Sequence, residues 1–351
     1  MEPFVYQALS QRVVFGSGTL ARVGEEIERL GCKRAIVLST ASQERKALAL
    51  AHDLAPLSAG IFAGAAMHAP VEVTDDALRA VAAANADCLV SLGGGSTIGL
   101  GKALALRTDL PQIAIPTSYA GSEATPILGE TAAGRKTTQR SPKILPEVIV
   151  YDVDLTLSLP PALTVTSGIN AMAHAIEALY AKERNPLISI LALEGIRALV
   201  KALPVLTRNP ADKTARSDAL YAAWACGTCL GAVGMALHHK ICHVLGGSFD
   251  LPHAETHTVI LPHAVGYNEG ATRGLLRPVA EIFGAETAAE GLFKFERTLG
   301  APMTLAGIGM PEAGLDRAAD EIVANPYWNP APVERDRIRA LLQDAFEGHQ
   351  P

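Results

Sequence analysis

Short apolar runs alternate with longer amphipathic stretches through the first half of the chain. Each run is bounded by polar or glycine positions, which is typical of strands buried in a parallel sheet. We predict strands at residues 4–8, 12–15, 35–39, 59–63, 87–91, 112–115 and 148–151. The intervening patterns predict helices at about 20–30, 43–54 and 74–85 and after residues 93–95, and a β-hairpin within 129–146.

The pattern changes after Leu159-Pro160-Pro161, where Ala- and Leu-rich segments of helical period are separated by Pro or Gly. Helices are predicted there at about 166–183, 186–203, 212–233, 235–246, 273–283, 288–298, 312–324 and 334–346. Strand–helix alternation followed by helices alone predicts two domains. We expect a Rossmann-like α/β dinucleotide-binding domain over residues 1–160 and an all-helical substrate domain over residues 161–351.

The composition is that of an ordinary globular protein: 49% of the 351 residues are hydrophobic, 19% are charged, and the formal net charge is −6. Nothing in it indicates a nucleic-acid partner or an anionic membrane surface. The uncharged segment 219–237 approaches membrane-spanning length, but its Ala, Gly, Cys and Thr content favours a buried central helix. With no recognisable secretory signal and five scattered cysteines, we expect a cytoplasmic protein.

Half of the ten histidines lie within one short segment: His238, His239, His243, His253 and His257. His239 and His243 are four residues apart, so their rings would share one face of a helix. We expect Gly246-Gly247 to end that helix and the turn at Leu251-Pro252 to bring His253 back toward it. Clustered imidazoles suit metal binding or proton transfer near neutral pH, whereas core histidines bonded to carbonyl groups are the structural alternative.

Two loops follow predicted strands and offer backbone N–H groups and hydroxyls to a phosphate. The first places these residues at the start of a helix: Gly94, Gly95, Ser96 and Thr97. The second contains Thr117 and Ser118. Ser39 follows the strand at 35–39, where dinucleotide-binding folds often carry an acid for the ribose. A neutral hydroxyl does not repel a 2′-phosphate, so we expect NADH as cofactor and NADPH to be accepted also.

Asn170 and His174 form a second polar pair at helical spacing. Together with His239, His243 and His253, they are expected to line one cleft. A nicotinamide carried by the α/β half would deliver its hydride where the two halves meet.

Along nearly its whole length the chain resembles the iron-containing alcohol dehydrogenase superfamily, which has the dehydroquinate synthase-like fold. The matching motifs are Gly-Gly-Gly-Ser (93–96), Pro-Thr…Gly-Ser-Glu (116–123), Ser-Gly-x-x-Ala-x-x-His (167–174), His-x-x-x-His (239–243) and Pro-His (252–253). In that family the first two build the NAD(P) site, an Asp and three His hold a metal, and a further His transfers a proton. The resemblance implies metal positions at Asn170, His174, His239 and His253, and a proton-transfer role for His243.

This sequence departs from the family in two places: Asn170 replaces the metal-binding Asp, and Gly99 replaces an Asp after the glycine-rich loop. A neutral amide is a poor ligand for a hard divalent cation, so we predict that no metal is required. Similarity to the maleylacetate reductase branch lies in segments 168–180, 237–247, 251–257 and 325–330. Members of that branch reduce the carbon–carbon double bond of 2-maleylacetate to 3-oxoadipate during the degradation of aromatic compounds.

The resemblance to that branch suggests a role for each candidate residue. His243 is the expected proton donor, and His174, His239 and His253 would hold the dianionic substrate. The remaining candidates around the substrate are Asn170, Lys240 and Tyr327.

Three other functions are compatible with the sequence. One is a metal-dependent alcohol or polyol dehydrogenase that tolerates Asn170. Another is a lyase of the dehydroquinate synthase fold, and the third is a dinucleotide-binding protein without activity. In each case a homodimer is expected, because that state is common in families of this type.

Overall fold

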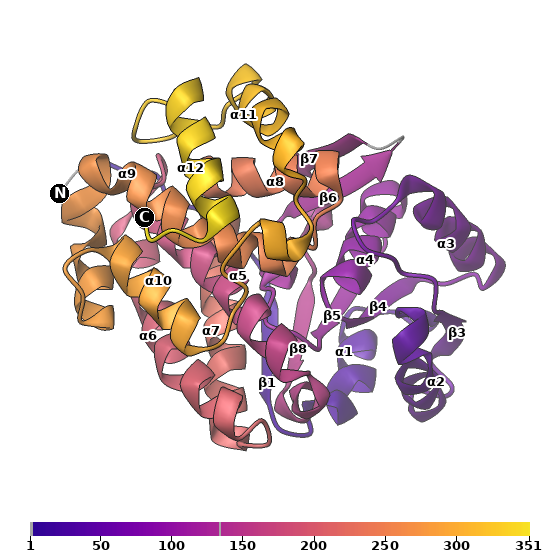
Figure 1. Ribbon diagram of the computed structural model, residues 1–351. Coiled ribbons are helices and arrows are strands. Elements are labelled where there is room, and N and C mark those ends of the chain that lie inside the picture. Colours follow the sequence, from indigo (N-terminus) through magenta and orange to yellow (C-terminus); the bar gives the residue numbers. More distant parts are fainter. Residues whose placement is uncertain (1–2, 133–134) are drawn as a thin grey trace. The chain divides into compact units, whose positions relative to one another are not determined.

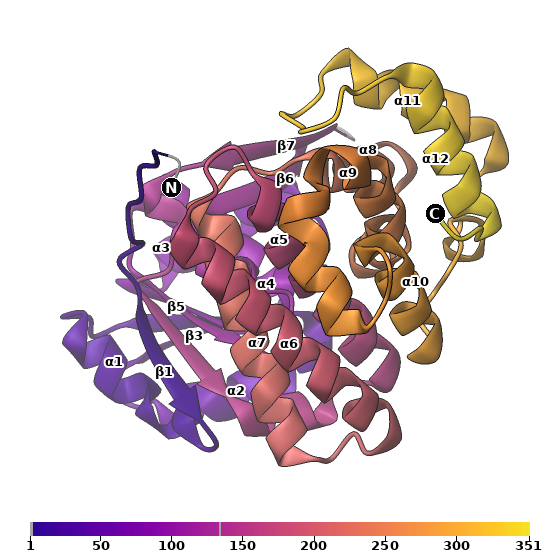
Figure 2. The same cartoon turned by 90° about the vertical axis from the view of Figure 1, so that its left-hand side faces the viewer.

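The computed structural model describes residues 3–132 and 135–351 (Figures 1 and 2). Residue contacts divide the chain into two compact units, which are residues 9–159 and residues 160–351 with those preceding Leu9. The division after residue 159 lies beside the boundary expected at 160. The start of the chain, however, groups with the helical unit instead of the α/β unit.

The α/β unit is built on one parallel six-stranded sheet, with the strand order β1-β8-β5-β4-β2-β3. Its strands are β1 (Arg12–Gly16), β2 (Ala35–Leu38), β3 (Ser58–Phe62), β4 (Cys88–Gly93), β5 (Gln112–Pro116) and β8 (Val148–Asp152). The predicted hairpin is present as the antiparallel strands β6 (Ile127–Ala132) and β7 (Arg135–Arg140). Residues 133 and 134 of the predicted hairpin lie outside the described residues.

Helices cover both faces of this sheet (Figure 1). They are α1 (Val23–Arg29), α2 (Glu44–Asp53), α3 (Val71–Ala83) and α4 (Gly95–Thr108). Successive strand residues point to opposite faces. Val37 therefore packs in the cluster that contains α1 and α2, whereas Ile36 packs in the one that contains α3 and α4. Because both faces of the sheet are buried, the sequences of its strands are continuous apolar runs.

The strand predicted at residues 4–8 is wrong, because residues 3–11 have no regular secondary structure. Their alternating pattern has no buried face, and the side chain of Val5 is 91% exposed. The first helix also begins later than predicted, because residues 19–22 form a 3-10 turn before α1.

The second unit contains only helices and short 3-10 turns among its described residues. Its helices are α5 (Pro161–Tyr180), α6 (Pro186–Arg208), α7 (Lys213–Ala232), α8 (Leu237–Phe249), α9 (His253–Phe283), α10 (Ala288–Thr298), α11 (Leu315–Ala324) and α12 (Arg335–Glu347). Helices α5, α6, α7 and α10 share one apolar core with α9, and Figure 2 shows α6 and α7 side by side. A second core joins α8, α11 and α12 to another part of α9. Helix α5 is buried along most of its length.

Three predictions about the segment around the histidines are wrong. Gly246-Gly247 lies inside α8 and does not end it. The segment 219–237 is not one helix, because α7 ends at Ala232 and α8 begins at Leu237 after a 98° bend. Helix α9 begins at His253 instead of residue 273 and continues through Pro262 and Pro278.

Among the described residues, no single helix combines the length and the apolar character that a membrane span requires. Helices α7 and α8 meet that test only as a bent pair, by length and composition.

Candidate active site

Three loops of the α/β unit meet at one edge of its sheet. They follow β2, β4 and β5, which are neighbours, and parallel strands bring their carboxyl ends to the same edge. The Thr117 N–H donates to the Gly93 carbonyl at 3.1 Å, and Gln43 Nε2 donates to Thr117 Oγ1 at 3.2 Å. The loops predicted to bind a dinucleotide are therefore tied to one another.

The glycine-rich loop passes close to the second loop at Gly94. A Cβ atom added to Gly94 would lie 3.1 Å from Ser118 Oγ. Gly94 caps α4, and Gly95, Ser96 and Thr97 form its first turn, whose N–H groups favour an anion. The hydroxyls of Thr97 and Ser39 are buried without a hydrogen-bond partner among the described residues.

The buried side chain of Lys102 forms hydrogen bonds with the second loop and with the residues that follow it. Lys102 Nζ donates to Thr125 Oγ1 and to the Ile127 carbonyl, each at 2.9 Å, and also to the Ser122 carbonyl. Burial lowers the pKa of Lys102 to about 7, while the nearby Glu123 acts in the opposite direction. Glu123 accepts a hydrogen bond of 2.8 Å from Tyr151. These buried contacts fix the loop that carries Thr117 and Ser118.

In the helical unit, α5 contributes a polar stripe to an otherwise apolar helix. Asn170, His174 and Glu177 lie at successive helical turns, and all three are buried. The Oδ1 atom of Asn170 has no hydrogen-bond partner among the described residues. Two side chains of this stripe, His174 and Glu177, contact His239 of α8.

Glu177 organises the beginning of α8. Its Oε2 atom accepts the Ala236 N–H at 2.8 Å and lies 2.7 Å from Nδ1 of His239. In this arrangement His239 Nδ1–H donates to the carboxylate, so Nε2 is the nitrogen that faces away from Glu177. That Nε2 atom is buried without a partner among the described residues. The His174 ring stacks on that of His239, with ring centroids 5.3 Å apart.

His243, one turn further along α8, lies beside Tyr327. Its Nδ1 atom is 2.9 Å from the Tyr327 hydroxyl. The ring centroids of His239 and His243 are 6.1 Å apart, as expected for side chains on one helical face. Lys240 Nζ lies 5.7 Å from the centre of the Tyr327 ring. Burial lowers the pKa of Lys240, and Glu321 acts in the opposite direction.

Tyr327 belongs to residues 325–334, a segment before α12 that we call the C-terminal strap. The side-chain amides of Asn329 and Asn268 exchange hydrogen bonds of 2.7 and 2.9 Å. The Tyr267 hydroxyl donates to the Pro332 carbonyl at 2.6 Å. Asn268 and Tyr267 both lie on α9, so this helix holds the strap that presents Tyr327.

Helix α9 also brings His253 and His257 into the cluster. Their ring centroids are 4.3 Å apart, and the His257 ring lies 5.1 Å from that of His239. Nδ1 of His257 lies 3.0 Å from Nε2 of His238, and Sγ of Cys242 is 3.8 Å from the same His238 atom. The pKa values of His238 and His257 are well below the usual value, chiefly because both rings are buried.

The structure brings the predicted residues of the helical unit into contact in steps: His174 with His239, His239 with His243, and His243 with Tyr327. His253 joins them through His257. The sequence-based selection of site residues omitted His257, His238 and Glu177. A carboxylate inside the apolar stretch 171–180 was the available signal for Glu177, because buried charges are almost always paired.

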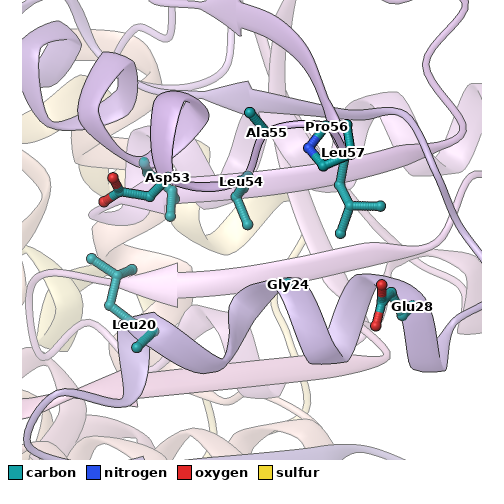
Figure 3. Close-up of a pocket in the computed structure, with 10 residues that line it drawn as sticks. Leu20, Gly24, Glu28, Asp53, Leu54, Ala55, Pro56 and Leu57 are labelled. Carbon is teal, nitrogen blue, oxygen red and sulfur yellow. The ribbon is translucent and has the colours of Figure 1, made fainter.

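A separate hollow of about 510 Å³ lies between α1 and α2 of the α/β unit (Figure 3). Its walls are mainly apolar, with the carboxylates of Glu28 and Asp53 among them. None of the residues predicted to bind cofactor or substrate lines it, so it has no place in the site described above.

Most of the chain matches two sequence patterns of one family. Residues 10–153 match the pattern described as iron-containing alcohol dehydrogenase, and residues 164–346 match its C-terminal part. The chain is 60% identical to a maleylacetate reductase of Rhizobium sp. (strain MTP-10005), with full coverage of both chains. It is 51% identical to one of Burkholderia cepacia, again with full coverage of both. A crystal structure of maleylacetate reductase from Agrobacterium tumefaciens is similar over both full chains, at 60% identity and a TM-score of 0.96.

Proposed function

Because the chain belongs to the iron-containing alcohol dehydrogenase family, we propose that it is an NAD(P)H-dependent oxidoreductase that reduces the double bond of 2-maleylacetate to 3-oxoadipate. The observation that carries the proposal is the buried imidazole cluster, in a chain where the sequence resemblance assigns Asn170 to the family's acidic metal position. Full-length similarity to maleylacetate reductases supports it.

The chemistry of a double bond conjugated to a ketone suits such a cluster. Hydride from NAD(P)H adds to the carbon β to the ketone, and the π electrons move to the ketone oxygen to form an enolate. Hydrogen-bond donors stabilise the enolate charge. The enolate then takes a proton at the α-carbon, and the products are 3-oxoadipate and NAD(P)+.

The side chains of the cluster divide these tasks in our proposal. His243 donates the proton, and the contact of its Nδ1 with the Tyr327 hydroxyl orients its ring. His174, His239 and His253 hold the substrate, whose two carboxylates are also attracted to Lys240. Glu177 fixes the ring of His239.

The family's metal does not fit the residues present here. Its four positions supply three imidazoles and the Asn170 amide, with no anionic ligand to balance a divalent charge. Among the described residues, the only three His, Cys or acidic side chains whose ligand atoms all lie within 4.8 Å are His238, Cys242 and His257. That group does not coincide with the family's positions, so we propose a reaction that needs no metal.

The decisive test is NADH consumption with maleylacetate, measured on the purified protein with and without a strong chelator. We expect turnover to survive chelation and 3-oxoadipate to appear in equal amount to the NAD+ formed. Turnover that is lost with chelator and restored by a divalent ion would overturn the metal-free proposal. No turnover of maleylacetate, with oxidation of alcohols or polyols instead, would establish the metal-dependent dehydrogenase as the function.

A cytoplasmic location and a homodimeric state complete the proposal. The five cysteines are all buried as free thiols, as suits a reducing compartment. Sedimentation of the purified protein tests the dimer.

A further inference from the structure

His257 occupies a position that the roles assigned above leave unexplained. It lies on α9 one turn after His253, it is fully buried, and its ring contacts those of three other histidines. Its Nε2 atom is buried without a hydrogen-bond partner among the described residues. Buried polar atoms are nearly always hydrogen-bonded, and an unpaired one in a native site calls for an explanation.

The contact with His238 leaves two possible arrangements of protons. One hydrogen lies between His238 Nε2 and His257 Nδ1, which are 3.0 Å apart. If His257 is the donor, the second proton of the pair is on His238 Nδ1, which is buried without a partner in the described part of the chain. If His238 is the donor, the second proton is on His257 Nε2, among the other imidazoles of the cluster.

The two arrangements differ in what a substrate does to them. An N–H on His238 Nδ1 is buried without a partner among the described residues, whereas one on His257 Nε2 gains a partner when an oxygen-rich dianion enters the cluster. An unmade hydrogen bond in a buried site is costly. When the proton is on His257 Nε2, substrate binding supplies the missing hydrogen bond and so removes the free-energy cost of the unpaired N–H.

We propose that His257 is a further catalytic residue whose Nε2–H, held in that tautomer by His238, donates a hydrogen bond to the ketone oxygen of the substrate and to the enolate oxygen that forms from it. This inference rests on the function proposed above. A neutral imidazole is a suitable electrophile, because it polarises a carbonyl without surrendering its proton. His257 thus stabilises charge, and His243 supplies the proton.

The same side chains have a second possible use, which the test must separate. The ligand atoms of His238, Cys242 and His257 lie within 4.8 Å of one another, a spacing compatible with a metal ion. An ion there would displace the hydrogen between the two imidazoles and require ionised Cys242. It would also convert His257 from a donor to a ligand.

The first experiment compares kcat and KM for maleylacetate in two variants at one position. His257→Leu removes the donor, and we expect kcat to fall by about 100- to 1,000-fold with a much smaller change in KM. His257→Gln places an amide N–H near the position of Nε2 and is expected to recover at least about tenfold of that loss. Equal activity of the Leu variant and the unaltered enzyme, or failure of Gln to improve on Leu, would overturn the proposal.

Two further variants test the positioning role of His238. His238→Leu removes the donor that fixes the tautomer, whereas His238→Gln retains an amide donor to His257 Nδ1. We expect kcat to be lower in His238→Leu than in His238→Gln. Cys242→Ala is the matched control, because it alters the same buried group but keeps both imidazole rings, and it should keep near-normal kcat. A metal ion in the unaltered protein that Cys242→Ala loses together with activity would contradict the proposal.

A measurement without substrate separates this inference from the proposed function. Ring-nitrogen NMR of ¹⁵N-histidine-labelled protein, assigned with the His257→Gln variant, reports which nitrogen of His257 is protonated. We expect a neutral ring with Nε2 protonated in the free enzyme. A proton on Nδ1, or on both nitrogens, would refute the inference even if the enzyme reduces maleylacetate. Inability to reduce maleylacetate, with the expected tautomer present, would instead count against the function.

Discussion

The Oε2 atom of Glu177 lies 2.7 Å from Nδ1 of His239, and both side chains are buried. This pair links α5 to α8, since the same carboxylate oxygen also accepts the N–H of Ala236. It fixes both the orientation of the His239 ring and the nitrogen that faces away from the carboxylate. In this respect it resembles the carboxylate–histidine pairs that orient imidazoles in many active sites.

Replacing Glu177 by Gln tests that pair. The Gln amide has the same shape and keeps one oxygen that can accept a hydrogen bond, but it lacks the negative charge that orients His239 Nδ1–H. We therefore expect kcat/KM to fall by roughly 10- to 100-fold. Steady-state kinetics with maleylacetate measures the effect. Glu183→Gln is the matched control, because Glu183 accepts the N–H of Gly234 in the same loop at 3.1 Å without contacting a histidine. Equal losses in both variants would assign the effect to the loop instead of the ring.

The proton-donor role of His243 is tested with its partner. His243→Ala is expected to lower kcat by about 100- to 10,000-fold, the usual contribution of a positioned acid. Tyr327→Phe removes only the hydroxyl that contacts Nδ1, so the expected loss of kcat is smaller, about tenfold. Tyr267→Phe removes a hydroxyl that donates to the strap but not to His243, so it measures the loss of kcat that comes from weakening the strap alone. Near-normal turnover of His243→Ala would eliminate it as the donor.

A carboxylate at position 170 should restore a metal site. Asn170→Asp adds a negative charge at the family's metal position beside His174, and we expect the purified variant to retain close to one divalent ion per chain after dialysis. Elemental analysis by mass spectrometry measures the ion. Gly99→Asp adds the family's other missing acid outside the histidine cluster and should retain none. If both variants bind no metal, the missing charge at position 170 is not what excludes the ion.

The stability of the protein is expected to fall in mild acid through His263. Burial against Phe293 lowers the pKa of His263 to about 4. Between pH 6.5 and about 4 the unfolded chain therefore binds a proton that the native state does not, so the free energy of unfolding decreases as the pH falls. The full effect is on the order of 3 kcal/mol.

Urea unfolding at a series of pH values measures this dependence. His263→Gln should reduce the slope of the curve between pH 6.5 and 4, to which the buried His238 and His257 also contribute. His52→Gln, at an exposed position, should leave the slope unchanged. Parallel curves for the unaltered protein and His263→Gln would show that other groups determine the acid sensitivity.

The sheet could be predicted because its strands are buried on both faces. Runs such as residues 35–38 and 148–152 consist mainly of apolar side chains, and every residue of both strands is buried. The hairpin at 127–140 was visible in the polar passage between them. The strand predicted at residues 4–8 was wrong because alternating apolar and polar residues do not form a sheet without a partner strand.

Helix α9 could not be predicted as one element, because local signals oppose it. Pro262 and Pro278 each remove a backbone donor from the helix interior, a cost that favours a break. Tertiary packing outweighs it: the helix contributes to both cores of the unit, with Leu261 in one and Ile260 in the other. The same reason keeps Gly246-Gly247 helical in α8, where Leu245 is fully buried.

The site was only partly visible in the sequence. The spacing of His239 and His243 predicted their shared face, and the structure has their rings 6.1 Å apart. Helical spacing says nothing about contacts between helices, so the bond from Glu177 to His239 and the pairing of His238 with His257 had no local signature.

The amide pair of Asn268 and Asn329 has a consequence for how the protein responds to ionic strength. The strap leads into α12, whose first residue, Arg335, forms exposed ion pairs with Asp316 and Asp320 that dissolved salt screens. The amide pair carries no net charge and Asn268 is fully buried. Added salt should therefore weaken the hydrogen bonds of this pair very little. Concentrated salt should therefore loosen the periphery of the strap while leaving the hydroxyl of Tyr327 in place.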